Sequence, residues 1–399
     1  MSYISADLGP FSEEQVSRAR RYHRPLYAAA MVGLILDFGV LALIVFSPLG
    51  GRLFAPFEHW PWWAGVIGLT AVVAGVRALV GLPISFWAGF SRERRWGFST
   101  QGLAGWLIDL VKGFGVALLL TAAALTALVG SARLFPSLWP LVAAAAGAAM
   151  VLTLGFAAPV VIEPLFNRFT PLDDVELAAQ LQAVAERAHV PVETVLVTDA
   201  SRRTRKTNAY VSGLGKTRRL VLYDTLVLQA SPAELSLVLA HELGHRRARH
   251  LLKGTLLGTV GLAAFIAILW ALLYSPGLRA AIGAPGGADD PRVVPFALLL
   301  ALILETLGMP IAAALSRRWE HEADRFSLQL THDLDSFENT HVALATANLS
   351  DLDPPKPIYL AFFTHPTPLE RIEAARRLAA APGFNPSSAA KETERVSAC

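Results

Sequence analysis

The apolar residues of this 399-residue chain are gathered into long runs separated by polar stretches. Six runs are each long enough to cross about 30 Å of hydrocarbon as an α-helix. They cover roughly residues 27–46, 62–87, 103–129, 138–161, 254–274 and 294–315. The pattern predicts a mainly α, polytopic membrane protein, with about six transmembrane helices in a barrel or bundle.

A long polar stretch separates the fourth run from the fifth and shows shorter periodicities. Residues 171–189 have the pattern of an amphipathic helix, and 194–197 that of a strand. Residues 208–212 and 219–223 read as two strands of a hairpin joined through Gly213–Lys216. We expect a small β-sheet here, which either binds an extended peptide along its edge strand or only supports a neighbouring helix.

The boundaries of these patterns divide the chain into regions. We predict a cytoplasmic N-terminus (1–25), four transmembrane helices (26–165), a cytoplasmic insert (166–253), two transmembrane helices (254–316), the C-terminal part of a catalytic domain (317–381) and a disordered tail (382–399). The tail is rich in Pro, Ser, Ala and mixed charges, a composition that does not form a packed core.

Composition strengthens the membrane assignment. Hydrophobic residues make up 53% of the chain, charged residues only 17%, and the mean hydropathy is +0.44. The net charge of +3 is small, and the arginines lie near predicted membrane edges, so we expect the lipid bilayer as a partner and no nucleic acid. The only cysteine is Cys399, which excludes an intramolecular disulfide.

The distribution of arginine predicts the orientation. Four arginines lie in the N-terminal region, and Arg92, Arg94 and Arg95 lie in the second loop. The positive-inside rule therefore places the N-terminus, the second loop and the insert in the cytoplasm. The excess of arginine over lysine is common in GC-rich genomes, so we expect the inner membrane of a bacterial cell.

Charged residues within the apolar runs have two interpretations. Membrane-buried charges are costly and need partners or water. Asp109 and Lys112 are three apart and either pair with each other or, together with other charges, line a polar, water-filled interior. The other charges are Asp37, Arg77 and Glu305.

The candidate chemistry lies in His241-Glu242-Leu243-Gly244-His245. Two histidines four apart on a helix share one face, so both imidazoles can reach a single Zn²⁺. Glu242 can then act as general base on a water molecule, as in zinc peptidases. The alternative is a buried helix that carries two histidines by chance.

The residues before this motif predict a helix start. Ser231 is a suitable N-cap, Pro232 fits the first helical position, and Glu234 completes a capping box. The apolar residues that follow indicate that the first turns are buried.

A catalytic zinc site needs a third protein ligand and an open position. Glu320 and Asp324 follow the last apolar run and share a helix face, so one can ligate while the other orients a ligand imidazole. His321 is a rival ligand, and a solvated charged helix is the alternative.

Further along, Thr364–Arg371 predicts a rigid turn leading into a helix. From this turn His365 could donate to a developing oxyanion and Arg371 could position it. A surface turn without catalytic role is the alternative.

These motifs together resemble the membrane zinc endopeptidases called CAAX prenyl proteases of type 1, relatives of the membrane heat-shock zincins. The similar segments are 93–98 (ERRWGF), 164–172 (PLFNRFTPL), 207–213 (TNAYVSG), 222–226 (LYDTL), the HELGH helix, 320–324 and 365–371. The zinc motif alone occurs in many families, whereas this combination in this order is highly specific.

The resemblance implies one Zn²⁺ per chain, held by His241, His245 and Glu320, with Glu242 as base. It also implies Asp324 as a catalytic residue, the partner of a ligand that is sometimes described as a proton donor. The implied fold is a barrel of tilted helices around a hydrated chamber. Eukaryotic members have seven spans, whereas six are counted here.

Two further pairs of residues receive roles from the resemblance. Asn208 and Ala209 would lie along the substrate strand. His365 and Arg371 would face the reacting carbonyl.

The expected activity is hydrolysis of peptide bonds at the cytoplasmic membrane face. The leading substrate is the prenylated C-terminus of a protein, from which the last three residues are removed. Two alternatives stay open: quality control of unlipidated membrane proteins, and a non-catalytic zinc-binding scaffold or transporter.

Overall fold

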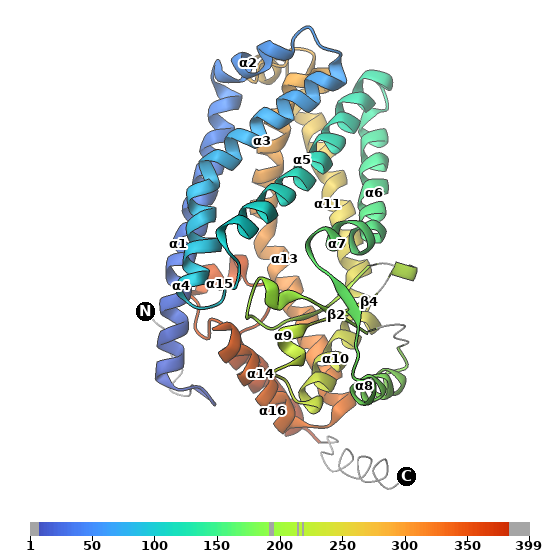
Figure 1. Cartoon of the computed structure of the whole chain (residues 1–399). Coiled ribbons are helices and arrows are strands. Elements are labelled where there is room, and N and C mark those ends of the chain that lie inside the picture. Colours follow the sequence, from blue (N-terminus) through green and yellow to red (C-terminus); the bar gives the residue numbers. More distant parts are fainter. Residues whose placement is uncertain (1–7, 191–194, 214, 218, 383–399) are drawn as a thin grey trace.

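The computed structural model describes residues 8–190, 195–213, 215–217 and 219–382. Most of these residues are helical, and one small sheet lies at one end of the molecule (Figure 1). We call this end, where the sheet and the HELGH helix lie, the site end, and the opposite end the far end. The predicted tail lies almost wholly outside the described residues.

Within the described residues, six helices are long and apolar enough to cross a membrane, which confirms the predicted number. They are α1 (Glu13–Phe46), α3 (Trp62–Phe86), α5 (Leu103–Leu134), α6 (Trp139–Ala157), α11 (His250–Leu273) and α13 (Val294–Thr331). Two of them continue through π-helical turns, α3 through η2 (Trp87–Arg92) into α4 (Glu93–Arg95), and α6 through η3 (Ala158–Ile162) into α7 (Glu163–Phe166).

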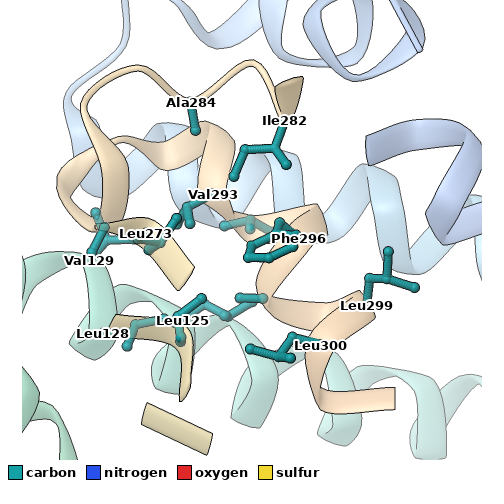
Figure 2. Close-up of a cluster of buried hydrophobic side chains, with 14 of the residues drawn as sticks. Leu125, Leu128, Val129, Leu273, Ile282, Ala284, Val293, Phe296, Leu299 and Leu300 are labelled. Atoms are coloured by element: carbon teal, nitrogen blue, oxygen red, sulfur yellow. The ribbon is translucent and has the colours of Figure 1, made fainter. Parts of the chain in front are cut away.

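A hydrophobic cluster fills the far end. Leu125 and Val129 of α5 meet Leu273 of α11 and Phe296 of α13, and all four are buried (Figure 2). Short elements cap this end: α2 (Leu49–Phe54), η1 (Ala55–Phe57), α12 (Pro276–Ala281), η6 (Gly287–Asp289) and η7 (Pro291–Val293). The helices are therefore held together by dry packing at the end away from the sheet.

A cavity of about 550 Å³ lies among the membrane helices, lined by residues of α1, α3, α5 and α13 and by Phe362. Asp37 and Arg77 in its wall form a bidentate ion pair, with both nitrogen–oxygen distances 2.6 Å. This pairing satisfies two charges that would otherwise be costly within a membrane.

Lys112 acts on Asp109 through its charge, but the direct hydrogen-bond partners of both residues lie elsewhere. Asp109 instead accepts hydrogen bonds from Arg203, at 2.7 Å from Nε, and from Gln101. Lys112 donates to the backbone carbonyl of Leu165. Each of the two charged side chains therefore has a partner that is distant in sequence, Arg203 for Asp109 and Leu165 for Lys112.

The sheet has four strands in the order β1-β2-β4-β3. They are β1 (Phe169–Pro171), β2 (Val195–Thr198), β3 (Ala209–Ser212) and β4 (Arg219–Tyr223). The antiparallel pairing of β3 with β4 confirms the predicted hairpin, and β1 is a strand that the sequence analysis missed. β2 and β4 run parallel, and β3 forms an edge of the sheet.

Short helices surround the sheet. They are α8 (Val175–Arg187), which is the predicted amphipathic helix, η4 (Ala200–Arg202), η5 (Gly215–Thr217) and α9 (Asp224–Val227). Leu181 and Val184 of α8 pack in one cluster with Leu222 of β4 and Leu239. The sheet and α8 are thus joined to the helix that carries the two histidines.

That helix, α10 (Pro232–Arg247), begins as predicted, with a complete capping box between Ser231 and Glu234 and proline in its first turn. It packs tightly on α13. A Cβ atom added to Gly244 would lie 2.9 Å from the Cα of Ala323, closer than real Cβ atoms come. Glycine is therefore required at this position of the motif for the two helices to approach.

Three helices follow α13 at the site end: α14 (Leu334–Asn348), α15 (Lys356–Phe362) and α16 (Pro368–Ala379). The turn before α16 ends in a capping box between Thr367 and Glu370, which agrees with the predicted helix start. α14 packs beside α10, and α16 packs on α14 and α13 (Figure 1).

We predict that Gly244→Ala destabilises the folded protein by roughly 1–3 kcal/mol and weakens metal binding, because overpacking must push α10 away from α13. Thermal unfolding and metal titration in detergent measure both effects. Gly258→Ala on α11 is the matched control, because its Cβ would meet no heavy atom within 4 Å. Equal melting temperatures and metal affinities for the two variants would contradict the close-packing argument.

Candidate active site

His241 and His245 lie one turn apart on α10, and their Nε2 atoms are 3.1 Å from each other. Glu320 of α13 completes a group of three. Its Oε2 lies 3.4 Å from Nε2 of His241, and its Oε1 lies 3.2 Å from Nε2 of His245. Of the described residues, only these three form a group that could hold a metal ion.

The three side chains fit a tetrahedral metal site. Ligand atoms about 2.0–2.1 Å from Zn²⁺ lie about 3.3 Å from each other, close to the separations observed here. Glu320 Oε2 is buried and has no hydrogen-bond partner among the described residues, a costly state for a carboxylate oxygen. A cation at this position would satisfy it.

α13 delivers both acidic residues to the site. This helix runs without interruption from the far end through the predicted sixth span to Thr331, so Glu320 and Asp324 belong to a membrane helix. Both side chains are buried and face α10. His321 is exposed and not part of the group.

Asp324 connects His241 to a buried arginine. Its Oδ1 lies 2.9 Å from Nδ1 of His241, and its Oδ2 accepts a hydrogen bond of 2.8 Å from Nε of Arg371. Arg371 Nη2 also contacts Oδ1. The carboxylate thus fixes the ring with Nε2 toward the metal position, and the arginine fixes the carboxylate.

His245 has an equivalent partner that the sequence analysis missed. Its Nδ1 lies 2.9 Å from Nδ1 of His250, whose Nε2 lies 3.2 Å from Glu322. His250 is buried and stacks on Trp319 at a ring distance of 5.0 Å. The available sequence signal was a histidine five residues after His245. The structure adds that Arg249, in the left-handed conformation, separates α10 from α11.

Glu242 faces the cleft beside the two histidines. Burial raises the pKa of its carboxyl group, while the two imidazoles oppose this shift, and the backbone N–H of Val211 also favours the charged form. A carboxylate whose pKa is raised in this way is suited to accept a proton.

Val211 lies on the edge strand β3. The backbone carbonyl of Asn208 accepts a hydrogen bond from the backbone N–H of Tyr223 in β4. Because backbone groups alternate in direction along a strand, those of Ala209 and Val211 point to the unpaired side of β3. Asn208 and Ala209 line the cleft, as the sequence resemblance implied for a substrate strand.

His365 approaches from the turn between α15 and α16. Its Nε2 lies 3.3 Å from Oε1 of Glu320, and its side chain is 63% exposed. Arg317 holds this turn, because its Nη1 donates to the backbone carbonyls of Tyr359 and Phe363. His365 is therefore at the rim of the site, with Arg371 in its interior.

The cleft that contains these residues has a volume of about 600 Å³. Its walls come from α1, α10, α14, β3 and the turn before α16. A metal-binding geometry of this kind, at one end of a bundle of membrane helices, is that of the membrane-embedded metallopeptidases.

Comparison with known proteins identifies the family within this class. Residues 171–379 match the family described as peptidase family M48, and residues 7–168 match the description "CAAX prenyl protease N-terminal, five membrane helices". The chain belongs to peptidase family M48, whose members are zinc metalloendopeptidases. In the second matched range the described residues form four long helices, not five.

Individual relatives cover most of the chain. An uncharacterised metalloprotease of Bacillus subtilis, YhfN, is 31% identical over 92% of this chain and 87% of its own. CAAX prenyl protease 1 of Saccharomyces cerevisiae is 28% identical over 76% of this chain and 70% of its own. The crystal structure of S. mikatae Ste24p superposes with a TM-score of 0.79 at 23% identity, covering 92% of this chain and 89% of that one, and so shares the fold.

We predict that His250→Ala weakens zinc affinity roughly 10–100-fold, because His245 loses the partner that orients its ring. Competition titration against a chromogenic chelator measures the affinity. His250→Asn should recover part of it, because an amide carbonyl can accept the same hydrogen bond. Unchanged affinity in His250→Ala would contradict an orienting role.

Proposed function

We propose that this protein is a zinc endopeptidase whose metal is held by His241, His245 and Glu320, with Glu242 as general base. The observation that carries the proposal is the convergence of three donor groups from two helices, one of them a buried carboxylate with an oxygen that no hydrogen bond within the described residues satisfies. Zn²⁺ bound there would lower the pKa of a water molecule and polarise the scissile carbonyl.

Glu242 carries out the proton transfers in this proposal. It takes a proton from the attacking water and gives it to the leaving amine, so no proton is lost to solvent. Its burial beside the two imidazoles supports the role, since the raised pKa makes the protonated intermediate accessible. His365 donates a hydrogen bond to the carbonyl oxygen as negative charge develops on it, and Arg371 adds positive charge from the interior.

The substrate binds as an extended chain along β3. The N–H groups of Ala209 and Val211 are engaged by the Asn208 side chain and by Glu242, so their outward-facing carbonyls are the groups that can accept hydrogen bonds from it, which lays the scissile bond beside Glu242. Asn208 contributes its side chain at the start of this strand. The exposed edge of a four-stranded sheet next to the metal position supports this arrangement.

The site end faces the cytoplasm in our proposal. The arginine-rich start of α1 and Arg92, Arg94 and Arg95 are at the same end of the molecule as α10 (Figure 1). The positive-inside rule assigns this end to the cytoplasmic side, which in a bacterial cell is the inner face of the inner membrane.

We further propose that the substrate carries a lipid close to the scissile bond, as the name of the CAAX prenyl protease relatives suggests. Phe362 lines both the cleft and the cavity of about 550 Å³ among the membrane helices. The cavity falls within the size range of sites for drug-sized ligands, so a peptide in the cleft could extend an attached prenyl chain into it.

We predict that Glu242→Gln retains zinc but lowers peptide hydrolysis by at least about 10²-fold, because an amide cannot take the proton of the attacking water. Metal analysis and turnover on a peptide substrate are measured on the same preparation. Full activity in this variant would refute the assignment of the base. Zinc present in the unmodified protein, with no hydrolysis of any peptide, would favour a non-catalytic scaffold.

We predict that a farnesylated peptide is cleaved faster than its unlipidated twin by at least about tenfold in kcat/KM, because burial of the lipid adds binding energy. The two peptides share one sequence, and the cleavage position is determined by mass spectrometry. Equal kcat/KM values would instead indicate a protease of unlipidated membrane proteins.

A further inference from the structure

One side chain in the wall of the cleft has no role in the proposed mechanism. His341 of α14 is only 6% exposed and lines the cleft. Its ring stacks on Phe337 at 4.2 Å, and its Nδ1 lies 2.8 Å from the backbone carbonyl of Phe337. A carbonyl only accepts, so Nδ1 carries the proton, and Nε2 is left as an acceptor.

Nε2 of His341 has no hydrogen-bond partner among the described residues. The atom keeps some accessible surface, and because the residue lines the cleft, Nε2 is open to the cleft. Burial, together with the charge of Arg371, lowers the pKa of His341 to about 3. The ring therefore stays neutral at physiological pH. It offers a fixed acceptor that cannot become a donor.

The cleft around His341 combines apolar side chains with the charge of Arg371, which is also bonded to Asp324 beside His241. Leu237 and Val238 of α10 line the same cleft one turn before His241, and Leu344 lies one turn after His341 on α14. Residues three or four apart share a helix face, so Leu237 and His241 present neighbouring side chains. This part of the cleft can therefore hold a substrate side chain directly next to the scissile bond.

We propose that His341 selects peptides in which a residue flanking the scissile bond carries a hydrogen-bond donor, a hydroxyl or an amide, at the end of a short side chain. This inference rests on the proposed peptidase function and assigns part of its specificity. An apolar side chain of the same shape would remove water from Nε2 and leave it unpaired, which is costly in a buried place. A carboxylate would be disfavoured too, because it and Nε2 are both hydrogen-bond acceptors and their lone pairs would repel.

The test measures binding of matched peptides to the zinc-loaded, full-length protein in detergent. The peptides carry Thr or Val, which are nearly isosteric, at each of the two positions that flank the scissile bond. Glu242→Gln is the background, so that binding is measured without cleavage. We expect Thr to bind about tenfold more tightly than Val at one of the two positions, corresponding to one buried hydrogen bond.

Adding His341→Leu to this background should remove the preference for Thr or reverse it. Leu344→Ala is the matched control, because it enlarges the same part of the cleft without touching Nε2. It should weaken binding of both peptides and leave their ratio unchanged.

Equal affinities for Thr and Val peptides at both positions, in the background that retains His341, overturn the proposal even if His341→Leu does not fold. A preference for Thr that survives in a folded, zinc-loaded His341→Leu protein overturns it as well. Failure of the protein with intact Glu242 to cleave any peptide would count against the peptidase function and leave the binding ratios interpretable.

Discussion

Gly244 allows α10 to lie against α13 so closely that a single methyl group would not fit between them. This approach brings Nε2 atoms on one helix to within 3.4 Å of a carboxylate on the other. Close packing of the two helix backbones is therefore what brings His241, His245 and Glu320 together. The same contact joins the sheet and α8, which pack on α10, to the membrane helices.

The buried charges of the site are stabilised in chains of contacts. Arg371, Asp324 and His241 form one chain, and Glu322, His250 and His245 form a second one that reaches solvent, since Glu322 is 56% exposed. In each of the two imidazoles, the nitrogen that faces away from Glu320 holds the contact that orients the ring. Among the described residues of the site, Glu320 keeps one buried oxygen without a hydrogen-bond donor, so a cation at this point would be stabilised electrostatically.

Local patterns predicted much of this structure. The spans follow from runs of apolar residues, α10 from its capping box, and the hairpin from two strands around glycines. Contacts between distant segments could not be predicted in this way. Asp109 pairs with Arg203, 94 positions away, and Glu322 reaches His250 across 72. Strand β1 has only three residues, one of them proline, so no alternation of apolar and polar residues can be recognised in it. The resemblance to a family, not the spacing, singled out Glu320 over His321.

α13 is a membrane span and the carrier of Glu320 in one unbroken helix. Glu320 lies five residues past Leu315, where the apolar run ends, hence about 7.5 Å further along the axis. That distance corresponds to about two residues of extended chain. In the function proposed above, a peptide anchored in the bilayer would therefore present to the metal position only those bonds that lie within a few residues of its anchor.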